Sequence, residues 1–490
     1  MTGALPPGWA VATIEELIVH TIQQRPPCTE AFHYVDIRSI DTATKRIADP
    51  KSLQMSEAPS RARQQLRTSD VLVSMTRPNL NAVAMVPQNL DGAIGSTGFH
   101  VLRSPETASW LFYAVQTEAF VSVMSSRVQG VMYPAIRPRD VLQYELPVPP
   151  LAEQRRIVAE IEKHLTRLDT ATTSLRHVAG ALRRYRAAIL QSACEGRLVR
   201  TGASLSVTNE QVPETAAEFR CRLIRQRSRS RQPASRHQPA HATLPEGWVW
   251  AYLAELGELN RGKSRHRPRN DPRLLDGPYP FIQTADIRRA DGHIRAYSQT
   301  YSELGLAQSR LWPAGTLCIT IAANIAETGI LTFPACFPDS VVGFLLENEP
   351  TTVRYLELFL RTAQGNLERF APATAQKNIN LETLYDLAIP LPSPSEQQRI
   401  VTEIDRRLSV IQELEQSVNA NLRRAYRLRQ SILKRAFEGK LVPQDPTDEP
   451  ASVLLDRIQT ERRASPTVAR RSRRARAYPL FEPVVQTAET

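Results

Sequence analysis

The sequence has 490 residues and a formal net charge of +12, and this length allows two or three domains, each with a sizeable core. No apolar run is long enough to span a membrane, and the opening MTGALPPGW lacks the regions of a signal peptide, so we expect a cytoplasmic protein. The five cysteines contain no CxxC pair, which disfavours a disulfide framework and a zinc site.

The positive charge points to nucleic acid, but its excess lies in two stretches. Residues 220–236 and 462–476 contain seven arginines each, and the rest of the chain is close to neutral. Basic runs rich in serine and proline are more often solvated linkers than nucleic-acid arms. Net charge alone therefore does not identify the partner.

Residues 1–150 are expected to form a first globular unit. Strand-like segments begin at Asp70, Ala82 and Phe99 and are separated by proline, asparagine and glycine. The pattern also predicts one helix over residues 110–125.

Residues 151–199 are predicted to form a long helix. Its apolar residues recur with a period of 3.5 over four heptads, which is typical of a coiled-coil seam, with polar breaks at Thr172 and Arg186. Prolines 149 and 150 precede it, and Gly196 stands where a helix would end. The predicted seam residues are Val158, Ile161, Leu165, Leu168, Leu175, Leu182 and Ile189.

Residues 200–243 are expected to hold a short helix and an Arg/Ser/Pro-rich linker, and residues 244–393 a second globular unit. The hydrophobic framework of the second unit matches that of the first, while the intervening segments differ in sequence and length. The matching segments begin at Tyr34 and Thr284, at Asp70 and Gly315, and at Gly98 and Gly343. This pattern predicts one fold that carries two different surfaces.

Residues 394–442 repeat the first long helix at a constant offset of 243 residues without a gap, which indicates an internal duplication. The polar breaks recur at Glu415 and Arg429, and Gly439 corresponds to Gly196. Residues 443–490 are expected to form a short helix and a basic tail. The seam residues predicted here are Val401, Ile404, Leu408, Ile411, Val418, Leu422 and Ile432.

The order of these segments predicts the topology. The first helix ends beside the second unit and the second helix begins there, so packing the helices together requires an antiparallel pair. We therefore expect an α+β fold, a pseudo-twofold rod in which two similar globular domains are joined by two long helices in an antiparallel coiled coil. If the pseudo-twofold axis passes close to Ala179 and Leu422, Arg186 lies near Glu415 in the antiparallel pair.

One segment, Gly257–Ser264, matches the phosphate-loop pattern GxxxxGKS. Such a loop must follow a buried strand and open a helix. Here the sequence continues with prolines at 268 and 272, which cannot build that helix. We interpret the segment as a basic loop whose lysine and arginines contact DNA phosphates, and nucleotide binding is the weaker alternative.

Catalytic and metal-binding patterns are missing from the sequence. We find no GxSxG or HExxH motif, no metal-ligand cluster, and no Asn/Asp-Pro-Pro-aromatic tetrapeptide of the kind expected in an amino-methylating enzyme. We therefore predict no catalytic, cofactor-binding or metal-binding residues in this chain.

Candidate DNA-binding residues lie in polar loops of the two globular units. Asparagine and glutamine can pair with adenine through two hydrogen bonds, and arginine can pair with guanine in the same way. An ordinary solvated turn is the alternative for each of them. The candidates are Arg77, Asn79 and Asn81 in the first unit, and Lys263, Arg265, Arg267, Asn324, Gln376, Lys377 and Asn378 in the second.

The combination of motifs resembles the specificity subunit of type I restriction–modification enzymes. The resemblance rests on the Gly-Trp openings at Trp9 and Trp248, on the helix entries PxPPLxEQRRIV and PLPSPSEQQRIV, and on the exits AxxEGRLV and AxxEGKLVPQDPxDEPA. It covers nearly the whole chain. The first exit departs from the pattern, because Val199 is followed by RTGASLS rather than PQDP.

The resemblance implies a non-catalytic DNA reader. Each globular unit would be a target recognition domain for one half of a split, asymmetric site in double-stranded DNA, and the helices would space the domains and dock two methylation subunits. S-adenosylmethionine and ATP would be bound by partner subunits, the ATP by a restriction and translocation motor.

Two alternatives remain open from the sequence. One is a coiled-coil adaptor that binds proteins and does not contact DNA. The other is a nucleotide-binding protein that uses the Gly257–Ser264 loop.

Overall fold

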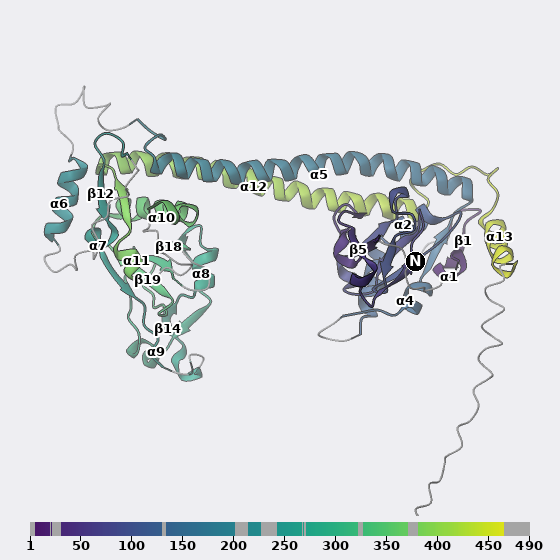
Figure 1. Cartoon of the computed structure of the whole chain (residues 1–490), viewed down its shortest axis with the longest axis horizontal. Helices are drawn as coiled ribbons and strands as arrows, with labels where there is room; N and C mark the ends of the chain where they lie inside the picture. Colours follow the sequence, from purple (N-terminus) through teal and green to yellow (C-terminus); the bar gives the residue numbers. More distant parts are fainter. Residues whose placement is uncertain are drawn as a thin grey trace, which may run out of the picture. The chain divides into compact units, whose positions relative to one another are not determined.

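The computed structural model describes residues 5–19, 21, 31–129, 134–200, 214–226, 243–266, 268, 271–321, 327–370 and 381–464. These residues belong to two compact units, one made of the parts before residue 177 and after residue 418, the other of residues 177–418. Each unit contains one globular domain and portions of two long helices (Figure 1). Within the described ranges, no helix has the length and hydropathy needed to cross a membrane.

The first domain is built from small sheets joined by short helices. Its strands are β1 (Ala10–Thr13), β2 (Ala31–Val35), β3 (Ile40–Asp41), β4 (Arg46–Ile47), β5 (Lys51–Gln54), β6 (Ala62–Gln65), β7 (Val71–Ser74), β8 (Val83–Met85), β9 (Ile94–Ser96), β10 (Phe99–Leu102) and β11 (Glu145–Val148). Its helices are α1 (Ile14–Leu17), α2 (Ala108–Ala114), α3 (Glu118–Ser126) and α4 (Pro138–Leu142). The sheet orders are β10–β7–β8, β5–β2–β9–β6, β1–β11 and β3–β4.

The second domain has a larger central sheet, in the order β13–β19–β17–β18–β15, and two strand pairs, β12–β20 and β14–β16. Its strands are β12 (Val249–Tyr252), β13 (Glu258–Arg261), β14 (Leu275–Phe281), β15 (Gly292–Ile294), β16 (Gln299–Tyr301), β17 (Leu317–Thr320), β18 (Thr328–Leu331), β19 (Val341–Leu345) and β20 (Ala388–Leu391). Its helices are α7 (Leu253–Leu256), α8 (Thr284–Arg289), α9 (Glu303–Ala307), α10 (Pro350–Phe370) and α11 (Leu381–Tyr385).

The two domains repeat one framework of strand pairings. In the first, β7 lies between β10 and β8, and in the second β17 lies between β19 and β18, with antiparallel pairing throughout. Strand β2 pairs antiparallel with β5 and parallel with β9. Likewise β14 pairs antiparallel with β16, and Phe281 makes a parallel bridge to Cys336. The second domain adds β13 and β15 to this framework.

The single helix predicted over residues 110–125 is wrong, because the chain forms α2 and α3 there. Thr117 separates them with an extended backbone, at φ −67° and ψ 145°. Its hydroxyl accepts a hydrogen bond from the Phe120 N–H at 3.2 Å. A capping threonine of this kind starts a new helix instead of continuing the previous one.

The two long helices are α5 (Leu151–Cys194) and α12 (Pro394–Phe437), of 44 residues each. At 1.5 Å per residue each is about 66 Å long. Gly196 and Gly439 follow their last turns with φ of +66° and +68°. The next amides, Arg197 and Lys440, donate back to the carbonyls of Ser192 and Arg435 at 2.8 Å. A glycine in this left-handed conformation ends each helix.

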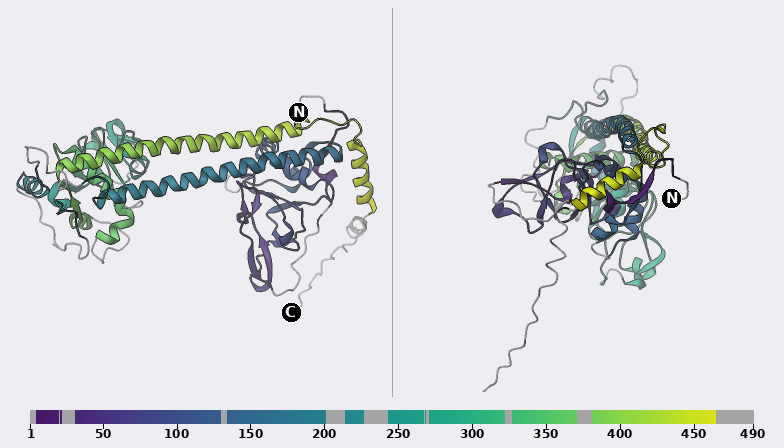
Figure 2. Two further views of the ribbon diagram at one scale, coloured as in Figure 1. Left: turned by 90° about the horizontal axis from the view of Figure 1, so that it is seen from above. Right: turned by 90° about the vertical axis from the view of Figure 1, so that its right-hand side faces the viewer.

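The helices lie side by side and antiparallel (Figure 2). In the first unit, the start of α5 shares a core with the end of α12, as Ile161 and Ile432 show. In the second unit, the end of α5 shares a core with the start of α12, as Ile189 and Ile404 show. The antiparallel pairing expected from the order of the segments is therefore present.

Every residue of the expected seam is buried or half-buried. One polar break, Arg429, pairs with Asp169 of α5 at 3.0 Å. The expectation that Arg186 meets Glu415 is wrong, because the Arg186 guanidinium bonds Asp291 of the second domain. The domain therefore contributes the carboxylate that we expected from the neighbouring helix.

Candidate nucleic-acid interface

A buried tryptophan joins each domain to the long helix that follows it. The Trp9 Nε1–H donates to Glu153 Oε2 at 2.9 Å, and the Trp248 Nε1–H donates to Glu396 Oε1 at 3.0 Å. Both carboxylates lie in the first turn of their helix and are almost completely buried. Burial raises the pKa of Glu153, and the Trp9 N–H partly offsets this effect. These contacts give the Gly-Trp openings and the helix entries a shared structural role.

The same tryptophans also face the end of the other long helix. A Cβ placed on Gly439 would lie 2.5 Å from Cγ of Pro6 and 3.3 Å from Trp9. A Cβ placed on Gly196 would lie 2.4 Å from Cγ of Pro245 and 3.4 Å from Trp248. Each domain is therefore held at the start of one long helix and at the end of the other.

Short helices reinforce the two junctions. Helix α6 (Ala216–Gln226) packs against α7, and α13 (Ala451–Ala464) packs against α1. Arg220 of α6 pairs with Glu255 at 2.8 Å, and Arg462 of α13 donates to the carbonyl of Glu15 at 2.8 Å. The arginine-rich segments flanking these helices lie mostly outside the described residues.

The predicted loop of the first domain separates into exposed and structural residues. Arg77 and Asn79 are exposed. The Asn81 amide is used inside the domain, because Nδ2 donates to the carbonyl of Val115 at 2.7 Å and Oδ1 accepts from Lys45 Nζ at 2.8 Å. Asn81 thus holds the turn, and it does so in the left-handed conformation, at φ +46°. Arg77 and Asn79 remain predicted DNA contacts.

Lys45 was not among the predicted functional residues, and no local pattern singles it out. It is half-buried, with φ +58°, and its ammonium also donates to the Asn81 carbonyl. Burial lowers its pKa from 10.5 to about 8, and the Arg429 guanidinium acts in the same direction. This cation is therefore destabilised in the fold.

We expect this lysine to make the first unit more stable in alkali. Between pH 8 and 10.5 the folded Lys45 loses its proton while the unfolded chain keeps it, so the free energy of unfolding rises with pH. Denaturant titrations at pH 7 and 9.5 should show this rise in the wild type and a smaller one in Lys45→Met. Equal pH dependence in the two proteins would contradict the lowered pKa.

The segment that matches the phosphate-loop pattern does not form a phosphate loop, as the prolines at 268 and 272 led us to expect. Residues 258–261 form strand β13, and residues 262–266 are not helical. A Cβ on Gly262 would lie 2.3 Å from the carbonyl oxygen of Phe337, so this glycine serves close backbone packing. The nucleotide-binding alternative is therefore wrong.

Two basic side chains that follow β13 are exposed on a backbone that neighbouring side chains fix. Lys263 and Arg265 are exposed. Their backbone is fixed, because the Lys263 carbonyl accepts from Ser309 at 2.8 Å and the Arg265 amide donates to Gln308 at 2.5 Å. The other candidates of this domain lie outside the described residues. They are Arg267, Asn324, Gln376, Lys377 and Asn378.

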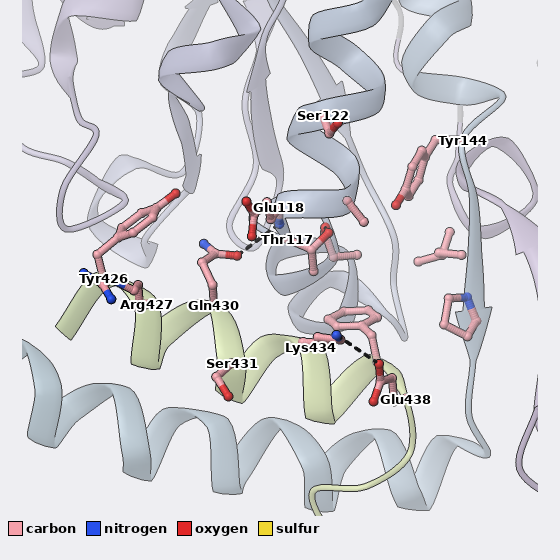
Figure 3. Close-up of a pocket in the computed structure, with 15 residues that line it drawn as sticks. Thr117, Glu118, Ser122, Tyr144, Tyr426, Arg427, Gln430, Ser431, Lys434 and Glu438 are labelled. Carbon is pink, nitrogen blue, oxygen red and sulfur yellow. Dashed lines mark hydrogen bonds and ion pairs between the residues drawn. The ribbon is translucent and has the colours of Figure 1, made fainter. Parts of the chain in front are cut away.

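A cavity of about 630 Å³ lies between the first domain and the last turns of α12 (Figure 3). Gln430 of α12 connects the two sides of the cavity through two hydrogen bonds. It accepts one from the Glu118 amide at 3.0 Å and donates the other to the Gln116 carbonyl at 3.2 Å. Much of the lining is apolar, including Phe437, and Tyr426 at its border is 63% exposed. The first domain and the last turns of α12 therefore share a largely apolar cavity.

Exposed apolar side chains also occur along the long helices. Tyr185 of α5 is 50% exposed and Leu428 of α12 is 48% exposed. These two residues are separated by the 243-residue offset of the duplication, so they occupy equivalent positions. The helices therefore present two related apolar positions to solvent.

Among the described residues, no group of three or more His, Cys, Asp or Glu is placed to hold a metal ion.

Comparisons with known proteins agree with one another. A family model described as the type I restriction modification DNA specificity domain matches residues 245–424. The specificity subunit of the Escherichia coli type I restriction enzyme EcoBI is 23% identical over 367 residues, 72% of each chain. That of EcoKI, from E. coli strain K12, is 22% identical over 496 residues, 94% of this chain and 97% of the relative.

A solved structure extends the similarity to three dimensions. It belongs to work on complex assembly and conformational transition of the type I restriction–modification system. Its chain aligns with a TM-score of 0.61 and 27% identity over 90% of this chain and 100% of that one. Together with the duplicated domain framework and the paired tryptophan junctions, these similarities show that the chain belongs to the specificity subunits of type I restriction–modification systems.

Proposed function

We propose that this specificity subunit, which is not itself an enzyme, reads a bipartite DNA site with one half-site for each domain. The observation that carries the proposal is the repeated framework, β10–β7–β8 in one domain and β19–β17–β18 in the other. The two copies are joined to the long helices by equivalent Trp–Glu hydrogen bonds. Their loops differ, so we infer that the two half-sites differ in sequence.

The proposed DNA-facing residues combine phosphate and base contacts. Lys263 and Arg265 are exposed on a backbone that neighbouring side chains fix, as phosphate contacts require. Asn79 has the chemistry to pair with adenine and Arg77 to pair with guanine. The five candidates outside the described residues, Arg267, Asn324, Gln376, Lys377 and Asn378, remain part of this proposal.

The long helices are proposed to dock two methylation subunits. Tyr185 and Leu428 support this because duplicated positions suit two copies of one partner. The cavity beside Tyr426 offers a further apolar contact at one of the two sites. On this proposal S-adenosylmethionine is bound by the methylation subunits, and ATP by a separate restriction and translocation motor subunit.

Replacing one domain tests the proposed division of labour. We expect that exchange of residues 10–145 for the corresponding domain of a relative changes one half of the methylated motif and leaves the other half unaltered. The reason is that each domain has its own core and its own exposed loops. Mapping of methyl-adenine in cells that carry the methylation subunit measures both halves. A change in both halves would show that the domains are not independent readers.

Substitution of the exposed apolar residues tests the docking proposal. Tyr185→Asp and Leu428→Asp should each remove one methylation subunit, and the double variant should remove both, because a buried charge opposes an apolar contact. Native mass spectrometry of the assembled complex counts the subunits. Leu304→Asp is a matched control, since Leu304 is 61% exposed on α9 of the second domain. Unchanged stoichiometry in the double variant would rule out these positions.

A further inference from the structure

A buried glutamate on α10 organises a group of charges in the second unit. Glu357 is fully buried, and its carboxylate accepts from Arg354 at 2.6 Å and from Thr328 at 3.2 Å. The Arg361 Nε lies 3.5 Å from the same carboxylate. Burial raises the pKa of Glu357, and the Arg361 and Arg354 guanidinium groups partly oppose this shift. Both arginines have further partners outside α10.

These further partners connect the second domain to both long helices. Arg354 also pairs with Asp405 of α12 at 2.6 Å. Arg361 pairs with Asp291, which lies between α8 and β15, at 2.7 Å. The same Asp291 oxygen accepts from Arg186 of α5. A continuous chain of ion pairs therefore runs from α12 through α10 to Asp291 and on to α5, and we call it the ionic clasp.

The ionic clasp lies beside an apolar contact with a different role. Leu356 and Phe359 of α10 share one core with Ile189 of α5 and with Val401 and Ile404 of α12. Apolar burial holds the domain against the helices but does not set a direction. Charge-assisted hydrogen bonds have preferred distances and angles. The clasp is therefore the part of this contact that can fix the angle of the domain on the helices.

In the described part of the first unit, the equivalent arginine has different partners. Arg429 corresponds to Arg186 through the 243-residue offset. It pairs with Asp169 of α5, and its contact to the first domain is a hydrogen bond to the neutral amide of Gln116 at 3.3 Å. Among the described residues, an acidic side chain of the domain itself pairs with this helix arginine in the second unit, at Asp291, and not in the first.

We propose that Asp291 is a positioning residue that holds the second domain at one angle, so that its half-site is read at a single spacing from the other. The inference rests on the proposed function of two DNA readers. Asp291 touches neither substrate nor cofactor in this proposal, and it acts through Arg186 and Arg361. Its loss should relax the spacing between the half-sites and leave their sequences unchanged.

The test maps methyl-adenine with the complete complex of the specificity and methylation subunits. For Asp291→Asn we expect sites with spacers about one base pair longer or shorter to gain methylation about tenfold, as suits the loss of a charge-assisted hydrogen bond. Both half-site sequences should persist. Asp291→Glu should restore much of the single spacing because it retains the charge. Glu347→Gln, an exposed acid of the same domain, is the control and should behave as wild type.

The outcomes separate the inference from the function on which it rests. A wild-type complex that methylates no bipartite motif would overturn the proposed function. A bipartite motif whose spacer stays unique in Asp291→Asn would overturn the positioning role, and so would a changed half-site sequence. If thermal melting shows no cooperative unfolding transition for Asp291→Asn, that variant is not folded. Arg186→Gln, which removes the α5 end of the ionic clasp, then takes its place. It should give the same relaxed spacing, and a unique spacer in that variant would also overturn the proposal.

Discussion

Gly439→Ala is expected to destabilise the first unit by about 2–5 kcal/mol. The left-handed conformation at φ +68° costs an L-residue about 1–2 kcal/mol. The added methyl would also lie 2.5 Å from the rigid ring of Pro6, and overpacking of this kind costs about 1–3 kcal/mol. The loss would loosen the contact between the end of α12 and the opening of the first domain.

A matched glycine separates the two costs. Gly92 lies in the same unit at φ +79°, and nothing lies within 4 Å of a Cβ placed there. Gly92→Ala should therefore lose only the conformational part, about 1–2 kcal/mol. In the second unit, Gly196→Ala and Gly247→Ala form the equivalent pair. Denaturant unfolding of each variant gives the four values, and equal losses within each pair would show that the close approach to proline has no energetic consequence.

The features predictable from the sequence are those with a local or repeated pattern. The 3.5-residue repeat located both long helices, and the constant 243-residue offset revealed the duplication. Glycine after the last turn located their ends, which the structure places at Cys194 and Phe437. The helices and their ends depend on neighbours three or four residues away, and the duplication appears when two segments of the chain are compared. A single sequence contains both kinds of information.

The features missed depend on residues far apart in the chain. Arg186 meets Asp291, 105 residues away, and no periodicity in either segment indicates that pairing. The role of Asn81 depends on Lys45 and on the carbonyl of Val115, which the fold alone brings together. Thr117 shows a different limit. Its capping hydrogen bond divides a segment whose composition favours one continuous helix.

The candidate DNA-binding residues were the least predictable part. Arg77, Asn79, Lys263 and Arg265 are exposed, as a contact to DNA requires, but exposure also suits an ordinary solvated turn. Whether such a residue contacts DNA or lies in a solvated turn depends on the shape of the DNA and on the loops that face it. A motif match has the same weakness, because the GxxxxGKS letters of Gly257–Ser264 fall on strand β13 and on the non-helical residues beside it.

Removing one heptad from each long helix should abolish methylation of the original site. Residues 171–177 and 414–420 occupy equivalent positions in α5 and α12, so their joint deletion keeps the seam in register. It shortens each helix by about 10 Å. If the helices set the distance between the two readers, that change corresponds to about three base pairs at 3.4 Å each.

The deletion also changes the direction in which the readers face the DNA. Three base pairs are about 100° of rotation in a duplex of 10–10.5 base pairs per turn, so two half-sites on one face no longer align. The variant should either accept a site with a spacer about three base pairs shorter or bind DNA poorly. Mapping of methyl-adenine distinguishes these outcomes, and thermal melting confirms that the shortened protein folds. Deletion of only four residues from each helix is the control, because it moves apolar residues out of the seam and should cost stability. A folded heptad variant that methylates the original spacer with unchanged efficiency would mean that the helices do not determine the distance between the half-sites.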